Sequence, residues 1–245
     1  MKTIFLTKND IYKGHLILVN ENYPVNENDV PDLKAVNGSD ITLRNTAALQ
    51  LDMAINEING RSGITPVSGY RSMEEQRNIW DDCLIENGME FTEKYVAKPA
   101  HSEHQTGLAI DLGMTCRHID FVRPDFPDNG ICGRFKTVAA KYGFILRYPS
   151  GKEHITKIAF EPWHFRYVGT PHEEIVEENG FVLEEYIEYI KRFKYGKQSL
   201  VFRNEYEISY LAAGNYPLED CNIIDISGNN RDGFIITKRG VAYER

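Results

Sequence analysis

The sequence predicts an α+β fold: a small, mostly antiparallel sheet flanked by helices, with a C-terminal β-rich appendage. Two observations carry this prediction. Apolar residues recur at three- to four-residue spacing in segments of helical length, and short apolar runs bounded by turn residues separate these segments. From Ser199 onward the helical spacing stops and only short β-rich runs remain. We therefore expect one domain over residues 1–195 and an appendage over residues 196–245.

The first half of the chain carries clear helix signals. Ser72 and Glu75 form a capping box that starts a helix, which places Arg71 immediately before it. Asp40 is the predicted N-cap of an earlier helix. The predicted elements of this half are a buried strand at Leu16–Asn20, a long loop over residues 21–40, a helix over 41–59, an extended segment over 64–70, and helices over 72–87 and 89–97.

The second half alternates strands and helices before the appendage begins. Thr170, Pro171 and Glu173 form a helix start, with a cap, a proline at the first helical position and an acidic third position. The predicted elements are strands at 108–112 and 144–148, an excursion over 114–129, a helix over 132–142, an irregular strand within 155–168, helices over 170–180 and 182–193, and appendage strands near 200–202, 206–211, 222–226 and 233–237.

The composition excludes some classes of partner. Hydrophobic residues make up 42% of the 245 residues and aromatic residues 11%, which is enough for a packed core. The formal net charge of −8 argues against a nucleic-acid partner, which usually shows as a basic stripe. The same charge disfavours binding to anionic membrane surfaces.

Cysteine usage and the N-terminus indicate a reducing compartment. Cys83, Cys116, Cys132 and Cys221 are scattered without a Cys-x-x-Cys pair, which is typical of free thiols, although Cys116 and Cys132 could meet across a loop. The N-terminal apolar run is too short for a signal peptide, and no stretch approaches the ~20 apolar residues of a membrane-spanning helix. We expect a cytoplasmic protein.

Two stretches carry the residues of a hydrolytic zinc site. His104 and Asp111 are separated by a turn that Gly107 permits, and Glu161-Pro162-Trp163-His164 follows further along. Such a site uses three protein ligands and leaves the fourth position open for water, whose pKa the metal lowers to roughly 7. His104, Asp111 and His164 are the candidate ligands, and Glu161 is a free carboxylate that can take the water proton.

Strand geometry sets a condition on this site. Positions three apart in a regular strand, such as Glu161 and His164, point to opposite faces. Both side chains can approach one metal only if Pro162 breaks the pleat, so we expect an irregularity there.

The same stretches resemble a known family. The run Ser-x-His-x-x-Gly-x-Ala-x-Asp from Ser102 to Asp111, the Glu-Pro-Trp-His from Glu161, and the upstream Ser68-Gly69-Tyr70-Arg71-Ser72 with Gln76 are similar to the VanY family of zinc D,D-carboxypeptidases. That family includes the VanXY dipeptidase/carboxypeptidases of vancomycin resistance. The resemblance covers about residues 14–193, and the short N-terminal apolar run favours the soluble VanXY branch.

The resemblance implies a role for each site residue. One Zn²⁺ is held by His104, Asp111 and His164, while Glu161 is the general base and Arg71 stabilises the oxyanion. Three further residues are expected to contact the substrate: Ser102, Gln76 and Trp163. Structural alternatives remain open, because Glu161 or Arg71 could be an ordinary ion-pair partner, Ser102 or Gln76 a local cap, and Trp163 a core residue.

The resemblance also implies a reaction. We expect hydrolysis of free D-Ala-D-Ala, or of the terminal D-Ala of the peptidoglycan-precursor pentapeptide, by a monomer or homodimer that contributes to vancomycin resistance. One alternative is an L-alanyl-D-glutamate endopeptidase of the same zinc-peptidase group, since a fold does not decide the substrate. Another is a non-catalytic zinc or peptide-binding module that uses the β-rich appendage as its interaction surface.

Overall fold

The computed structural model describes residues 3–26, 29 and 31–240, and the fold is of the predicted α+β class. Two compact units make up the chain: a central unit of residues 19–182, and a terminal unit of residues 1–18 and 183–245. The sequence instead places residues 1–18 and 183–195 with the first domain. The difference arises because the first strand pairs with a strand near the C-terminus.

A four-stranded antiparallel sheet in the order β4-β5-β7-β6 lies at the centre of the central unit. Strands β5 and β7 are buried almost throughout, whereas the middle of β4 is only half-buried. The strand bounds are β4 Ile64–Ser68, β5 Ala109–Met114, β6 Phe144–Leu146 and β7 His164–Tyr167.

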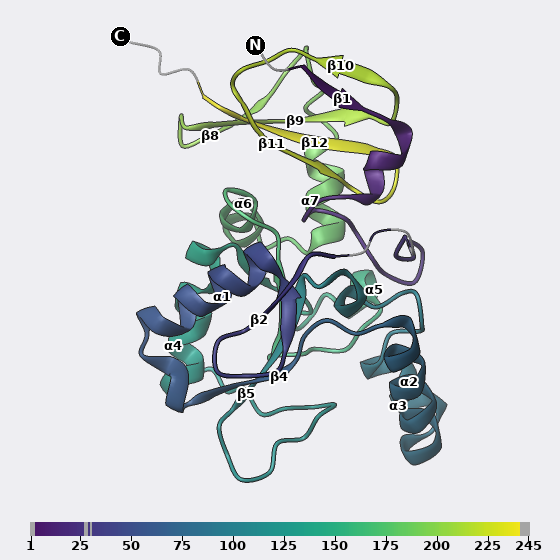
Figure 1. Cartoon of the computed structure of the whole chain (residues 1–245), viewed down its shortest axis with the longest axis vertical. Coiled ribbons are helices and arrows are strands. Elements are labelled where there is room, and N and C mark those ends of the chain that lie inside the picture. The colour runs from purple at the N-terminus through teal and green to yellow at the C-terminus, as the bar shows by residue number, and fades with distance from the viewer. Residues whose placement is uncertain (1–2, 27–28, 30, 241–245) are drawn as a thin grey trace. The chain divides into compact units, whose positions relative to one another are not determined.

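Helices cover this sheet. Figure 1 shows α1 lying beside α4 on one side of the unit and α2 beside α3 on the other, and both pairs are in contact. A short hairpin of β2 and β3 precedes α1. The bounds are β2 Leu33–Ala35, β3 Thr42–Arg44, α1 Asn45–Glu57, α2 Met73–Asn87, α3 Met89–Tyr95, α4 Gly130–Ala139, α5 Glu153–Thr156 and α6 His172–Asn179.

Three predictions for the first 45 residues are wrong. The helix begins at Asn45 and not near residue 41, because Thr42–Arg44 instead pairs with Leu33–Ala35 as β3. That pairing also places a strand inside the predicted loop over 21–40, of which residues 27, 28 and 30 lie outside the described residues. No strand forms over residues 16–19. Their backbone bonds singly to the chain near residues 227–229 instead: Leu16 N–H donates to the side-chain Oγ of Ser227 at 2.8 Å, and Leu18 N–H donates to Asn229 O at 3.2 Å.

The capping prediction for α2 is confirmed. Ser72 Oγ accepts from the Glu75 backbone N–H at 3.1 Å, and the Glu75 carboxylate accepts from the Ser72 backbone N–H at 2.7 Å. Gly88 ends the helix with a φ of +79°. The start of α2 is therefore fixed by local chemistry, and Arg71 is held immediately before it.

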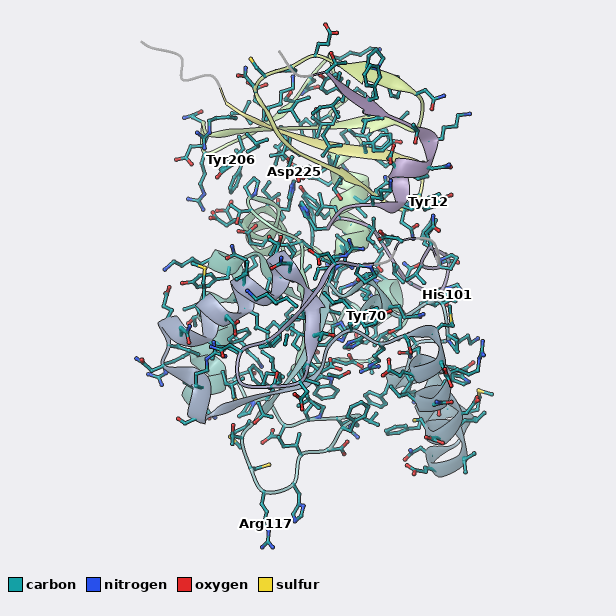
Figure 2. All side chains as sticks on the ribbon, viewed as in Figure 1. Tyr12, Tyr70, His101, Arg117, Tyr206 and Asp225 are labelled. Carbon is teal, nitrogen blue, oxygen red and sulfur yellow. The ribbon has the colours of Figure 1, made fainter. Side chains whose placement is uncertain are left out.

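The excursion between β5 and α4 contains neither helix nor strand over residues 115–129, as predicted. Figure 2 shows Arg117 at its outer end, where the side chain is exposed. The inner end is anchored, because Met114 N–H donates to Asp125 O at 2.7 Å and Phe126 is buried against Phe135.

The terminal unit is built from both ends of the chain. Its four-stranded antiparallel sheet has the order β11-β12-β9-β8, and β1 pairs with β10 in a separate ribbon. Residues from both ends form one buried cluster: Leu6, Ile11, Leu218, Phe234 and Ile236. The bounds are β1 Ile4–Leu6, α7 Leu183–Ile190, β8 Leu200–Phe202, β9 Tyr206–Ala212, β10 Tyr216–Leu218, β11 Ile223–Gly228 and β12 Gly233–Arg239.

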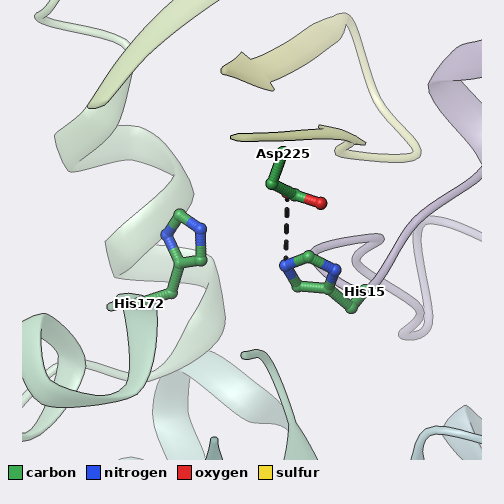
Figure 3. A group of neighbouring side chains, drawn as sticks. All are labelled: His15, His172 and Asp225. Atoms are coloured by element: carbon green, nitrogen blue, oxygen red, sulfur yellow. Dashed lines mark ion pairs between the residues drawn. The ribbon is translucent and has the colours of Figure 1, made fainter. Parts of the chain in front are cut away.

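His15 joins the N-terminal segment to β11 within this unit. Its Nε2 lies 3.5 Å from Asp225 Oδ2 (Figure 3). The third side chain in that view, His172, is the first residue of α6 in the central unit and is fully buried. The predicted helix start there shifts by one position, because Pro171 is the N-cap residue and follows Thr170 through a cis peptide bond.

All four cysteines are free thiols, so the possible Cys116–Cys132 pairing does not form. Cys83 and Cys132 are buried, whereas Cys116 and Cys221 are exposed. Among the described residues, no helix combines the length and the apolar character needed to cross a bilayer.

Glu173 makes the stability of the protein depend on pH. The side chain is buried in the first turn of α6, and this burial raises the pKa of its carboxyl to about 7 although Thr170 Oγ1 donates to it. In the unfolded chain the group ionises near pH 4.5. The folded protein therefore loses stability as the pH rises from about 4.5 to about 7, by at most about 3–4 kcal/mol.

We expect Glu173→Gln to unfold at higher urea concentration than wild type at pH 8 and at nearly the same concentration at pH 4.5. The amide oxygen can still accept from Thr170, so the variant removes only the charge. Glu74→Gln, in the exposed first turn of α2, is the matched control and should change neither midpoint. A Glu173→Gln gain of equal size at both pH values would contradict this assignment.

Candidate active site

The register of β5 against β7 brings the first two candidate ligands together. Asp111 in β5 lies directly opposite His164, the first residue of β7. Directly opposed residues in an antiparallel pair project from the same face of the sheet. As a result, His164 Nδ1 lies 3.0 Å from Asp111 Oδ1, although 52 residues separate them in the chain.

His104 reaches the same point from a 3-10 turn over Glu103–Thr106. The turn ends at Gly107 with a φ of +69°, and a side chain there would also crowd the Arg44 backbone at 3.1 Å, so the predicted glycine turn is present. His104 Nδ1 lies 2.7 Å from Gly69 O and its Nε2 lies 3.1 Å from Asp111 Oδ2. The backbone carbonyl therefore turns Nε2 toward the aspartate.

The three candidate ligands fit a zinc ion. One ligand atom from each of His104, Asp111 and His164 lies within 4.8 Å of the others, and all three residues are buried. Ligands of a tetrahedral zinc, bound at about 2.1 Å, would be about 3.4 Å apart, which is close to the separations of 3.0 and 3.1 Å found here. Asp111 Oδ1 is buried without a hydrogen-bond partner among the described residues, as expected of an oxygen that binds a cation.

The buried charges set the protonation of the site. Burial and the nearby Arg71 charge lower the pKa of His104 to about 4, so that its imidazole is neutral and able to bind a metal. Burial alone would raise the pKa of Asp111, but the interactions of its carboxylate with His104 and His164, hydrogen bonds among them, hold it below its usual range. Asp111 is therefore a carboxylate, the form that a metal ligand requires.

Glu161 stands beside this cluster because the chain turns before β7 begins. The turn is closed by His164 N–H donating to Glu161 O at 3.3 Å, so the irregularity predicted at Pro162 is present. Glu161 Oε2 lies 3.4 Å from His164 Nδ1. Burial, reinforced by Asp111 and opposed by His164, raises the pKa of Glu161 to about 8, a value suited to proton transfer near neutral pH.

Arg71 contacts the cluster from the short loop between β4 and α2. Its Nη2 lies 3.0 Å from Asp111 Oδ2, and its Nε donates to Ser68 Oγ at 2.8 Å. Gln76 Oε1 accepts from Arg71 Nη1 at 3.3 Å, while Gln76 Nε2 donates to Ala97 O. Both ends of the Gln76 amide are thus engaged by the protein, and Gln76 does not line the cavity.

A cavity of about 40 Å³ opens onto these side chains. Ser102 and Trp163 line it, as do Arg71, Glu161 and all three candidate ligands. A larger hollow of about 510 Å³ shares four lining residues with it: Val96, Ala97, Tyr148 and Ile158. The site is therefore a narrow pocket that adjoins a wider surface cleft within the central unit.

This geometry agrees with the comparisons to known proteins. Residues 40–170 match the family model VanY, described as D-alanyl-D-alanine carboxypeptidase. This chain belongs to the VanY family. It is 40% identical over 179 residues to the bifunctional D-Ala-D-Ala dipeptidase and D-Ala-D-Ala carboxypeptidase VanXYC of Enterococcus gallinarum, an alignment that covers 71% of this chain and 94% of that protein.

A solved structure extends the similarity to nearly the whole chain. The vancomycin resistance D,D-dipeptidase VanXYg, in complex with a D-Ala-D-Ala phosphinate analog, is 48% identical, has a TM-score of 0.93, and is matched over 97% of this chain and 98% of that one. A mutant of the D,D-pentapeptidase VanY from the VanB-type cassette, in complex with Zn(II), is 28% identical with a TM-score of 0.59, over 71% of this chain and 98% of that one. The sequence-based family assignment is confirmed.

Two residues of this VanY-family site are missing from the sequence-based prediction. Tyr148 lines the cavity with its ring centre 4.7 Å from that of His164. Glu103 lies beneath His164 and accepts from Arg147 Nε at 2.9 Å and Arg166 Nη1 at 2.7 Å. The sequence did contain a signal for Glu103, because it is an acidic residue next to the candidate ligand His104. Arg147 and Arg166 lie in otherwise apolar segments, where each arginine needs an acidic partner.

We expect the wild-type protein to retain zinc through dialysis and His104→Ala or His164→Ala to lose it, because each variant removes one of the three candidate ligands. Metal content measured by plasma mass spectrometry checks this. His118→Ala is the matched control, since His118 is exposed in the 115–129 excursion and should not affect zinc. Undiminished zinc in His104→Ala would exclude this cluster as the metal site.

Proposed function

We propose that this protein is a zinc-dependent D,D-peptidase that hydrolyses D-Ala-D-Ala and the terminal D-Ala of the peptidoglycan-precursor pentapeptide. One observation carries the proposal: Glu161 and Arg71 flank the cluster of His104, Asp111 and His164 at one pocket. A site that only bound zinc would need neither Glu161 nor Arg71. Family membership supports the same reaction over the stem-peptide endopeptidase and over a binding module.

The proposed cofactor is one Zn²⁺ per chain, held by His104, Asp111 and His164. When bound, it supplies an electrophile for the substrate carbonyl and makes an attacking water acidic enough to lose its proton near neutral pH. Glu161 takes that proton and gives it to the leaving amine. Its buried position beside His164, 3.4 Å from Nδ1, keeps both transfers short and out of bulk water.

Arg71 is proposed to stabilise the negative charge that develops on the carbonyl oxygen. The contact with Ser68 and the capped helix that follows hold its guanidinium in place before substrate arrives. A donor fixed in advance costs no reorganisation during the reaction. Ser102 and Trp163 line the same pocket and are proposed to contact the substrate directly, whereas Gln76 is proposed to act through Arg71.

The size of the site supports two substrate lengths. A cavity of about 40 Å³ leaves room for little beyond the reacting end of a peptide, and the adjoining hollow of about 510 Å³ can take the remainder of a longer one. We propose action in the cytoplasm on free dipeptide and soluble precursor, as a monomer or homodimer. Removal of D-Ala-D-Ala termini would contribute to vancomycin resistance.

The decisive experiment measures D-alanine released from D-Ala-D-Ala and, separately, from a precursor pentapeptide. Zinc-loaded wild type should release it from both. Glu161→Gln should lose at least about 100-fold in kcat, the lower range for general acid–base catalysis, while its zinc content stays unchanged.

Each other outcome has a distinct meaning. Release from only one substrate would make the enzyme a dipeptidase or a carboxypeptidase alone. No release from either by zinc-loaded wild type would refute the proposal. Full activity in Glu161→Gln would remove that residue from the reaction.

Arg71→Ala should lower kcat by about 100- to 1,000-fold, the usual loss for one oxyanion donor, with a smaller change in KM. Arg77→Ala is the control, because Arg77 is exposed on α2, the helix that begins just after Arg71. Steady-state kinetics on the dipeptide separates the two constants. Equal effects of the two variants would mean that Arg71 has no specific part in catalysis.

A further inference from the structure

A buried cluster of charges lies behind the site. Glu103 Oε1 accepts hydrogen bonds from both Arg147 Nε, at 2.9 Å, and Arg166 Nη1, at 2.7 Å. All three side chains are completely buried. Burying an ionised carboxylate is costly unless it is paired, and here two guanidinium groups share a single oxygen. The other oxygen of Glu103 is left for a different partner.

That second oxygen faces His164. Glu103 Oε2 lies 3.8 Å from His164 Nε2, and both atoms are buried with no hydrogen-bond partner among the residues that the structure describes. The opposite ring nitrogen, Nδ1, faces Asp111 Oδ1 at 3.0 Å. The two nitrogens of His164 therefore point to two different carboxylates, one in the pocket and one behind it.

His104 shows the same arrangement with a different acceptor. Its Nε2 faces Asp111, and its Nδ1 lies 2.7 Å from Gly69 O. A histidine that binds a metal through one nitrogen usually donates its other N–H to a carbonyl or carboxylate, which fixes the tautomer and the ring orientation. Gly69 O meets this need for His104, and Glu103 is the group placed to meet it for His164.

We propose that Glu103 is a positioning residue for His164: it accepts the Nε2–H of the imidazole and so presents Nδ1, as a neutral donor, to the metal. Arg147 and Arg166 hold the carboxylate from behind. This inference rests on the proposed function, because it assumes a zinc ion at the cluster. It accounts for the second oxygen of Glu103, Oε2, which is buried without a hydrogen-bond partner among the described residues.

The alternative is that Glu103 only neutralises the arginines. Two variants separate these roles. Glu103→Gln replaces the acceptor behind His164, whereas Arg166→Met breaks the same cluster but leaves the carboxylate paired with Arg147. We expect Glu103→Gln to weaken zinc binding about 10- to 100-fold, measured by chelator competition, and Arg166→Met to weaken it clearly less, because Arg147 still holds the carboxylate.

A measurement on the wild-type protein covers the case in which either variant fails to fold. In ¹⁵N-histidine NMR spectra of the zinc-loaded protein, His164 should be protonated at Nε2, and that proton should exchange with solvent far more slowly than the ring protons of exposed His118. A His164 ring protonated at Nδ1, or one whose Nε2 proton exchanges as fast as in His118, would overturn the proposal.

The remaining outcomes are also decisive. Equal weakening of zinc binding in both variants, or none in Glu103→Gln, would leave Glu103 with a structural role only. If wild type itself binds no zinc, the proposed function fails, and this inference fails with it. If wild type binds zinc and hydrolyses D-Ala-D-Ala but Glu103→Gln matches it, only the inference about Glu103 is lost.

Discussion

The pairing of β5 with β7 is the constraint on which the rest of the site depends. It places Asp111 opposite His164, and the turn before β7 then brings Glu161 to the same edge of the sheet. Side chains alternate between faces along a strand, so a slip of one residue would place Asp111 and His164 on opposite faces of the sheet. No local feature can replace this register, because Asp111 and His164 are more than 50 positions apart in the chain.

Charge balance is the second constraint. Three carboxylates are buried in and behind the pocket, those of Glu103, Asp111 and Glu161, and each lies near at least one cationic or imidazole group. Burying so many charges costs stability, and the cost is offset only when the partners are well placed. A divalent cation at the cluster would give a positively charged partner to Asp111 Oδ1, which is buried without a hydrogen-bond partner among the described residues. Binding of the proposed metal would thereby also stabilise this region.

The terminal unit follows a different principle. Its core joins Leu6 and Ile11, near the start of the chain, to Phe234 and Ile236 near the end. A β-rich segment of about 50 residues is marginal by itself, and the N-terminal strand and helix α7 add apolar surface that it can bury. Neither group belongs to the residues 196–245 that composition alone marks as an appendage. The change in composition at Ser199 marks the end of the helical segments. The packed unit has other limits, because it begins again at Leu183 and includes residues 1–18.

The sequence by itself determined the α+β class, the helix that follows Arg71, the glycine turn after His104 and the residues of the candidate zinc site. These depend on local features of the sequence: helix caps, turn residues, and side chains that can bind a metal or transfer a proton. Only the tertiary structure decided that residues 42–44 pair as a strand, that Gln76 holds Arg71, and that Glu103 lies behind His164 between two arginines. Each of these depends on contacts between distant segments, and a pattern of neighbouring residues contains no information on which distant groups will meet.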